Sequence, residues 1–119
     1  AIAPLDATVI DTFGLANPLG ARITPTQPGV IGHEKILPSA WLVADFADPA
    51  VTAGVPAAEL AAARHALTCG ELAELLASVR APLTLGRFWA NLVGAPRRTR
   101  LVIPADPIAA EAALCAAGR

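Results

Sequence analysis

Several features that mark membrane-spanning and nucleic-acid-binding proteins are scarce in this chain. Only 16% of its 119 residues are charged, and the net charge of −1 gives no general attraction to nucleic acid. No apolar run approaches the roughly 20 residues that a membrane-spanning helix requires. The chain also opens without Met, at Ala1. We therefore expect a single soluble domain over residues 1–119, excised from a longer protein, with no nucleic-acid partner.

Motifs for covalent catalysis and phosphate binding are missing as well. There is no Gly-x-Ser-x-Gly sequence around a nucleophilic serine and no glycine-rich loop that would hold a phosphate. No catalytic residue is predicted on these grounds. A stand-alone hydrolase would need Asp11, His33 and Glu34 to converge in one cleft, which the sequence cannot establish.

The chain has only two cysteines, Cys69 and Cys115, and neither has the close Cys or His pairing of a zinc motif. His33 and Glu34 could begin a metal site, but nothing local brings further ligands to them. We therefore expect no metal. A disulfide between the cysteines would close a long loop, and two buried thiols are the alternative. The residues alone leave both open.

Alanine and leucine in helical spacing dominate the rest of the chain, which predicts a mainly α domain of about five or six short helices with minor β structure. Helices are expected over 18–23, 40–46 and 57–67, then from about 70 until Pro82 stops the helix, from 85 to Gly94 and Pro96, and from 107 onward. Short strands are expected near 7–10 and 99–103. The Pro/Gly/Ala-rich residues 48–56 should form a connector.

Helix starts are predicted from side chains that accept backbone N–H groups. Thr84 and Asp106 are suited to this role, and Thr68 with Glu71 has the spacing of a capping box. The predicted core side chains follow helical spacing. They are Trp41, Leu42 and Phe46; Leu60, Ala63 and Leu67; Leu72, Leu75, Leu76 and Val79; Leu85, Phe88, Trp89 and Leu92; and Ile108, Ala112 and Cys115.

Residues 11–37 stand apart, because polar groups gather there in a stretch with little periodicity. The stretch holds Asp11, Arg22, His33, Glu34 and Lys35, and loops on a rigid scaffold often carry function. A structural role is the favoured interpretation, with Asp11 and Arg22 forming an ion pair that clamps the loop. Ligand contact is the alternative. For the basic cluster at 97–100, a solvated turn is favoured over contact with a phosphate. Core positions are favoured for both tryptophans over a sugar-stacking platform.

Two runs of this region also carry a family resemblance. They are Asp11-x-x-Gly14-Leu15-x-x-Pro18-Leu19-x-Ala21-Arg22 and Gly32-His33-Glu34-Lys35-x-Leu37-Pro38-x-x-Trp41. Later runs are Ala66-Leu67-x-Cys69-Gly70-x-Leu72, Pro82-Leu83-Thr84-x-x-Arg87-Phe88-x-x-Asn91 and Ile103-Pro104-x-Asp106-Pro107. Together they resemble the C-terminal extracytoplasmic part of the actinobacterial terminal β-(1→2)-arabinofuranosyltransferases.

The resemblance implies a parent enzyme with a multi-helix membrane domain. That enzyme would transfer arabinofuranose from decaprenyl-phosphate, a polyprenyl-phosphate donor, to arabinan at the extracytoplasmic face of the membrane. This chain would then be a soluble cap without catalytic residues or a cofactor of its own. Its partners would be the arabinan acceptor and the membrane domain of the same chain.

On this resemblance, the residues expected to contact the acceptor are Asp11, Arg22, His33, Glu34, Lys35 and Trp41. An envelope-facing domain lies in an oxidising place, so the resemblance also favours a disulfide between Cys69 and Cys115. The alternative function is a structural or protein-interaction domain of an envelope protein that binds no sugar. That alternative predicts a loop whose charges are paired internally, and an apolar surface patch.

Overall fold

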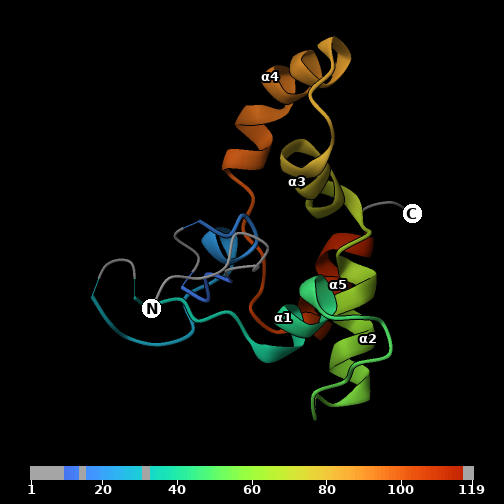
Figure 1. The fold of residues 1–119 in the computed structure, drawn as a ribbon. Coiled ribbons are helices and arrows are strands. Elements are labelled where there is room, and N and C mark those ends of the chain that lie inside the picture. The colour runs from blue at the N-terminus through green and yellow to red at the C-terminus, as the bar shows by residue number, and fades with distance from the viewer. Residues whose placement is uncertain (1–9, 14–15, 31–32, 117–119) are drawn as a thin grey trace, which may run out of the picture.

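A computed structural model of the chain describes residues 10–13, 16–30 and 33–116. The predicted mainly helical fold is confirmed (Figure 1). The helices are the short 3-10 helix η1 (Gly20–Arg22), α1 (Ser39–Phe46), α2 (Ala57–Ala66), α3 (Gly70–Arg80), α4 (Leu85–Thr99) and α5 (Pro107–Cys115). Within the described residues, no helix is both long enough and apolar enough to cross a membrane.

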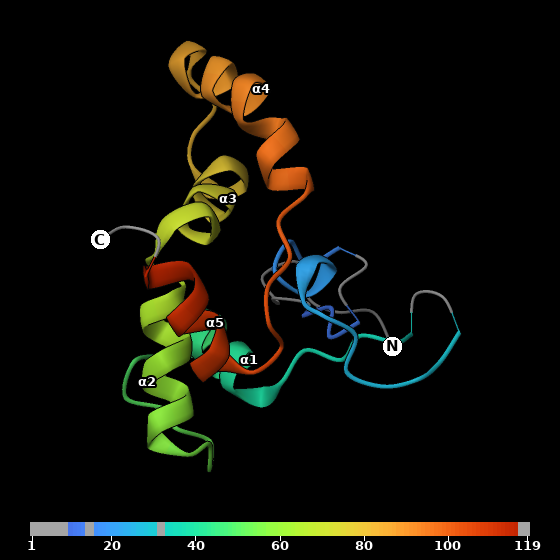
Figure 2. The same ribbon diagram turned by 180° about the vertical axis from the view of Figure 1, so that it is seen from behind.

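The core lies where α1, α2 and α5 meet. Helices α2 and α5 run side by side in both views of the ribbon (Figures 1 and 2). Trp41 is fully buried between them and the N-terminal region, and its Nε1 donates to the carbonyl oxygen of Ala105 at 2.8 Å. The core also contains Leu19, Ile23, Leu37, Ala40, Ala63, Ala66, Leu72, Leu75, Leu76, Ile103 and Ala110.

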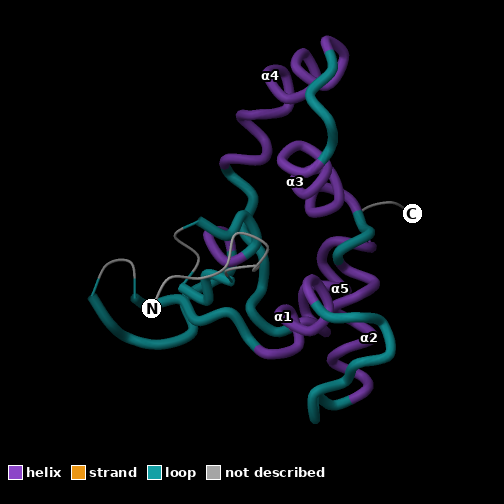
Figure 3. The backbone as a smooth tube through the Cα atoms, in the orientation of Figure 1, coloured by secondary structure: helices purple, strands orange, loops and turns teal. Residues whose placement is uncertain are grey.

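The described parts of the N-terminal region, residues 10–13, 16–30 and 33–37, are mostly loop and lie beside the extended segment that connects α4 to α5 (Figure 3). A single parallel bridge joins Ile23 to Ile103, with N–H···O distances of 2.9 Å from Thr24 to Ile103 and from Ile103 to Arg22. The strand predicted at 99–103 is therefore reduced to this bridge. The strand predicted at 7–10 falls almost entirely outside the described residues.

Two of the three predicted N-caps are confirmed. The side chains of Thr84 and Asp106 accept the backbone N–H groups of Arg87 and Ala109. The capping box is wrong, because α3 begins at Gly70 after Cys69 without a side-chain cap. The hydroxyl of Thr68 instead donates to the last turn of α2.

Helix α4 is longer than predicted, because it continues through Pro96 to Thr99. The guanidinium of Arg98 folds back along the helix and donates to the carbonyl oxygens of Ala90 and Asn91. Gly94 leaves the room for this, since a Cβ there would overlap the guanidinium. These two carbonyls are not the one that Pro96 deprives of its helical N–H, which is the carbonyl of Leu92 four residues earlier.

Several predicted core positions are wrong. Phe46 and Val79 are 40% and 57% exposed. Helix α5 buries Pro107 and Ala110 rather than Ile108 and Ala112. The whole predicted core face of α4, including Trp89, is exposed. Residues 48–56, predicted as a connector, form a non-helical link between α1 and α2 with positive φ at Ala53 and Gly54.

Candidate functional site

The start of the described chain is organised by two side chains. The carboxylate of Asp11 accepts backbone N–H groups of Phe13, Ala16 and Asn17. The Oδ1 of Asn17 in turn accepts the N–H groups of Leu19 and Gly20 at 2.9 and 3.2 Å. These bonds hold the chain in a turn that leads into η1, as expected of Asx side chains in loops.

Arg22 bonds to backbone carbonyls in place of the predicted ion pair with Asp11. Arg22 donates from Nε to the carbonyl oxygen of Arg98 at 2.8 Å and from Nη1 to that of Pro18 at 3.1 Å. Lys35 likewise donates from Nζ to the carbonyl oxygen of Ala21 at 2.8 Å. Both cations therefore donate to backbone carbonyl oxygens in a segment with almost no secondary structure of its own. Their role in the structure is to stabilise this irregular backbone.

His33 and Glu34 lie in a separate loop that folds on itself. The carbonyl oxygen of Glu34 accepts N–H groups of Thr26 and Gln27, and its carboxylate accepts the N–H of His33 at 3.1 Å. The exposed imidazole of His33 stands edge-on to the ring of Phe13, with 5.4 Å between ring centroids. His33 thus exposes its ring to solvent while its backbone N–H is bonded within the loop.

The predicted acceptor residues are spread over different surroundings. Asp11 lies at the start of the described chain and Arg22 ends η1, to whose backbone Lys35 bonds. His33 and Glu34 occupy the loop. Trp41 is enclosed in the core, where its indole cannot stack on a sugar. The prediction that Trp41 is a core residue is confirmed, and its assignment as an acceptor contact does not fit this burial.

Asp11 does line a cleft of about 400 Å³, which falls in the range of small-molecule sites. The cleft forms where the described residues 10, 11 and 16–18 meet the C-terminal ends of α1 and α3. It is lined by Ile10, Asp11, Ala16, Asn17, Pro18, Phe46, Val79 and Arg80. Its wall is mainly apolar, with a few polar groups at fixed positions.

Arg80 is the basic residue of this cleft, and it is held by Asp45. Its two terminal nitrogens each donate to one carboxylate oxygen of Asp45 at 2.7 Å. These hydrogen bonds raise the pKa of Arg80 above its ordinary value, although partial burial opposes the shift. The arrangement uses two of the five guanidinium N–H donors. The Nδ2 of Asn17 is buried, and no hydrogen-bond partner for it is found among the described residues.

Sequence reasoning missed Phe46, Val79 and Arg80 as members of a cleft. Phe46 and Val79 follow the apolar spacing of their helices and were therefore expected in the core. No local pattern separates a core position from a cleft position at a helix end, because the difference depends on a distant segment. Here that segment is 10–18, which lies more than 20 residues before Phe46.

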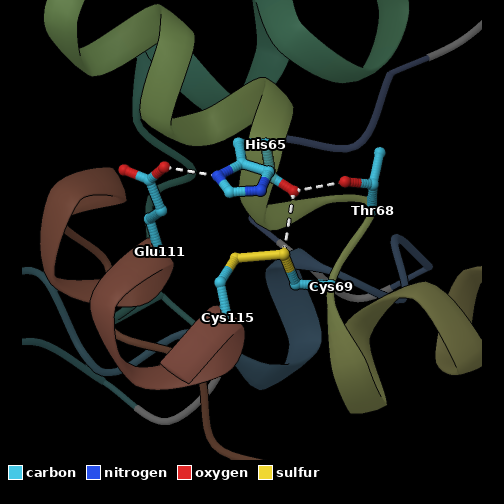
Figure 4. Close-up of a disulfide and its surroundings, with 5 residues drawn as sticks. All are labelled: His65, Thr68, Cys69, Glu111 and Cys115. Atoms are coloured by element: carbon cyan, nitrogen blue, oxygen red, sulfur yellow. Dashed lines mark hydrogen bonds and ion pairs between the residues drawn. A yellow bond between two sulfur atoms is a disulfide. The ribbon is translucent and has the colours of Figure 1, made fainter. Parts of the chain in front are cut away.

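A disulfide joins Cys69, at the start of α3, to Cys115, at the end of α5 (Figure 4). The Nδ1 of His65 contacts the carboxylate of Glu111 beside it, and Thr68 donates to the carbonyl oxygen of His65 at 2.7 Å. The ends of α2, α3 and α5 are therefore linked at one place.

His65 and the two sulfur atoms are also the one group of three metal-ligand side chains found among the described residues, with ligand atoms within 4.8 Å of one another. The sequence argument overlooked that His65 lies four residues before Cys69. Metal ligation by cysteine requires thiolates, whereas these sulfur atoms are bonded to each other.

Comparison with known proteins identifies the family. Residues 1–111 match the family model described as the AftB family C-terminal domain. The chain is 36% identical over 107 residues to a terminal β-(1→2)-arabinofuranosyltransferase of Mycobacterium tuberculosis, which covers 87% of this chain and 17% of that protein. It is 40% identical over 92 residues to a protein of the same name in Corynebacterium glutamicum, covering 76% and 13%.

The chain thus spans about a sixth or less of the length of these curated relatives. No solved structure matches it. The match to the family model extends over both the N-terminal loops and the helices, and it confirms the resemblance identified from the sequence. This chain belongs to the family of AftB C-terminal domains.

Proposed function

We propose that this chain is an accessory domain of a terminal β-(1→2)-arabinofuranosyltransferase, and that it holds or guides the arabinan acceptor. Family membership and the names of the two relatives support the link to this enzyme. The parent would be a membrane protein that takes arabinose from a polyprenyl-phosphate donor at the extracytoplasmic face. In this proposal the donor and the catalytic residues belong to the rest of the parent.

The observation that carries acceptor binding is the cleft beside Asp11. A furanose has hydroxyl groups that need fixed donors and acceptors, and C–H faces that pack on apolar or aromatic surface. The cleft offers the exposed ring of Phe46 together with the remaining donors of Arg80, whose side chain is partly exposed. Its volume suits one or two sugar residues.

This assignment moves the acceptor contacts away from Arg22, Lys35 and Trp41. Those side chains are engaged with the carbonyl oxygens of Arg98, Pro18, Ala21 and Ala105. A sugar would have to displace these bonds at a cost of about 1 kcal/mol or more each. Of the residues predicted from the sequence, Asp11 remains as part of the cleft lining.

The test is an NMR titration of the isotopically labelled chain with a short arabinofuranosyl oligosaccharide. We expect millimolar affinity, about −4 kcal/mol, with shifts on Phe46, Val79 and Arg80. Phe46→Ala should abolish these shifts. Phe13→Ala is the matched control, because Phe13 is 42% exposed against 40% for Phe46 but stacks on His33 in the loop.

Shifts centred on His33 and Lys35 that Phe13→Ala removes would place the acceptor on the loop instead. No shift at millimolar ligand would overturn acceptor binding and favour a second candidate function, a structural or protein-interaction domain. Two observations support that candidate: the cations of the loop are bonded to its own backbone, and a helix carries an apolar patch on the surface.

A further inference from the structure

Helix α4 turns its apolar face toward solvent. Its exposed apolar side chains are Leu85, Phe88, Trp89, Leu92 and Val93, with exposed fractions from 48% to 78%. Their spacing of three and four residues places them on one side of the helix. In Figures 1 and 2, α4 extends away from α1, α2 and α5. We call these five residues the α4 apolar face.

The opposite, polar side of α4 attaches the helix to α3. The guanidinium of Arg87 lies 3.3 Å from the carboxylate of Glu74, and Asn91 donates from Nδ2 to the carbonyl oxygen of Ser78 at 2.9 Å. Arg97 forms a close ion pair with Glu71. These contacts fix the rotation of α4 about its own axis. The apolar face therefore points outward because the polar face is bonded inward.

An outward face of this composition is costly in water. Burial of each of these large side chains would be favourable, because it removes apolar surface from water. Contiguous exposed apolar surface in a folded protein marks an interaction site more often than not. Phe88 and Trp89 also form an edge-to-face pair with ring centroids 5.6 Å apart, which keeps two aromatic rings together at the centre of the face.

Charge indicates what covers this face. Residues 81–105 contain four arginines and no aspartate or glutamate. Arg87 and Arg97 are paired with glutamates of α3, and Arg98 is folded onto its own helix. Arg100 is exposed at the end of α4, and no side-chain partner is found for it in the described structure. An apolar face with aromatic rings, on a segment whose own charged residues are all arginine, is the pattern of a helix that lies on a lipid surface.

We propose that α4 lies along an anionic lipid surface, with its apolar face in the boundary between headgroups and acyl chains and Arg100 among the lipid phosphates. A second copy of the chain is a poorer occupant. An α4–α4 contact would bring two Arg100 side chains together without an acidic residue from 81–105 to offset them. This proposal is independent of acceptor binding, because it uses a different surface.

The experiment measures binding of the 119-residue chain to vesicles of phosphatidylcholine and phosphatidylglycerol in equal amounts, by co-sedimentation and tryptophan fluorescence. Trp41 is fully buried, so a blue shift on binding reports Trp89. We expect such a shift, with weaker binding to pure phosphatidylcholine vesicles and at high salt. Leu85→Ser with Leu92→Ser should weaken binding by about tenfold or more.

Val30→Ser is the matched control, since Val30 is as exposed as Leu85, at 76%, but lies in the N-terminal loop. It should bind vesicles as the parent chain does. Urea midpoints of all variants establish that each is folded. Absence of vesicle binding, or equal binding by the double variant, would overturn the proposal. Self-association that the double variant abolishes, without lipid binding, would assign the face to a second copy.

Discussion

Helices α3 and α4 follow one another and share the same apolar spacing, yet they use it in opposite ways. In α3, Leu72, Leu75 and Leu76 are at most 7% exposed. In α4, the residues at equivalent spacing are at least 48% exposed, and the helix is held to α3 by charged and amide groups. The spacing thus identifies a helix with one apolar side. Which side meets a neighbour is decided by the long-range arrangement of the chain.

The largest expected difference between the two regions comes from their tryptophans. Trp41→Ala should lower the free energy of unfolding by about 3–5 kcal/mol, because it leaves a cavity and removes the bond to Ala105. Trp89→Ala should change it by about 0.5 kcal/mol or less. Urea unfolding followed by circular dichroism measures both. Similar losses for the two variants would show that the α4 face is covered within the chain.

The disulfide lies in the packed region. Its removal should lower the free energy of unfolding nearly as much as Trp41→Ala does. Its cysteines are 46 residues apart, for which loop entropy predicts about 4 kcal/mol, and engineered disulfides often stabilise by less than this prediction. Cys69→Ala with Cys115→Ala should therefore lower stability by about 2–4 kcal/mol in urea unfolding. Reduction of the parent chain should reproduce the midpoint of the double variant. An unchanged midpoint would contradict a stabilising role.

Two arginines, Arg80 and Arg87, should also differ in how much their loss lowers the free energy of unfolding. The Asp45 side chain is 2% exposed, so Arg80→Ala would leave a buried carboxylate without its partner. We expect a loss of about 2 kcal/mol, below the usual cost because Arg80 itself is 45% exposed and water can replace it. Arg87→Ala breaks a pair whose Glu74 is 55% exposed and should cost about 0.5 kcal/mol. A larger effect at Arg87 would reverse this ranking and indicate that the α3–α4 contact is the tighter one.

The smallest expected effects distinguish two glycines within α4. Gly86→Ala should stabilise the chain by about 0.5–1 kcal/mol through helix propensity, since the nearest group to the added Cβ is the Thr84 hydroxyl at 4.0 Å. Gly94→Ala should instead be neutral or destabilising by about 1 kcal/mol, because Arg98 must leave its carbonyl partners. Thermal unfolding resolves the sign. Equal stabilisation by both substitutions would show that the Arg98 contacts contribute nothing.

Helix starts could be predicted from the sequence where a cap acts over three residues, as at Thr84 and Asp106. The end of α4 could not, because Gly94 and Pro96 usually mark a helix end, whereas here both lie inside the helix. The inward face of α5 was also missed. Pro107 and Ala110 face the core through the position of α5 beside α2, which no pattern within 107–115 encodes.

The candidate site was less accessible to sequence reasoning than the fold. Arg22 and Lys35 look like ligand contacts in the sequence. Their actual partners are carbonyl oxygens of irregular backbone, and the sequence does not show which of these carbonyls lack a backbone donor. The cleft has the same origin, since Phe46, Val79 and Asp11 meet across segments far apart in the chain. The family motifs identified the protein class well, because a resemblance draws on many positions at once.

The link between Cys69 and Cys115 has a consequence for proteolysis. It closes a covalent ring that contains all of α3 and α4, together with the segment that pairs with Ile23. A protease that cuts the exposed residues between α3 and α4 opens this ring without dividing the molecule. The nicked chain would run as one species on a non-reducing gel and as two after reduction, so α4 stays attached to its domain even when the backbone beside it is severed.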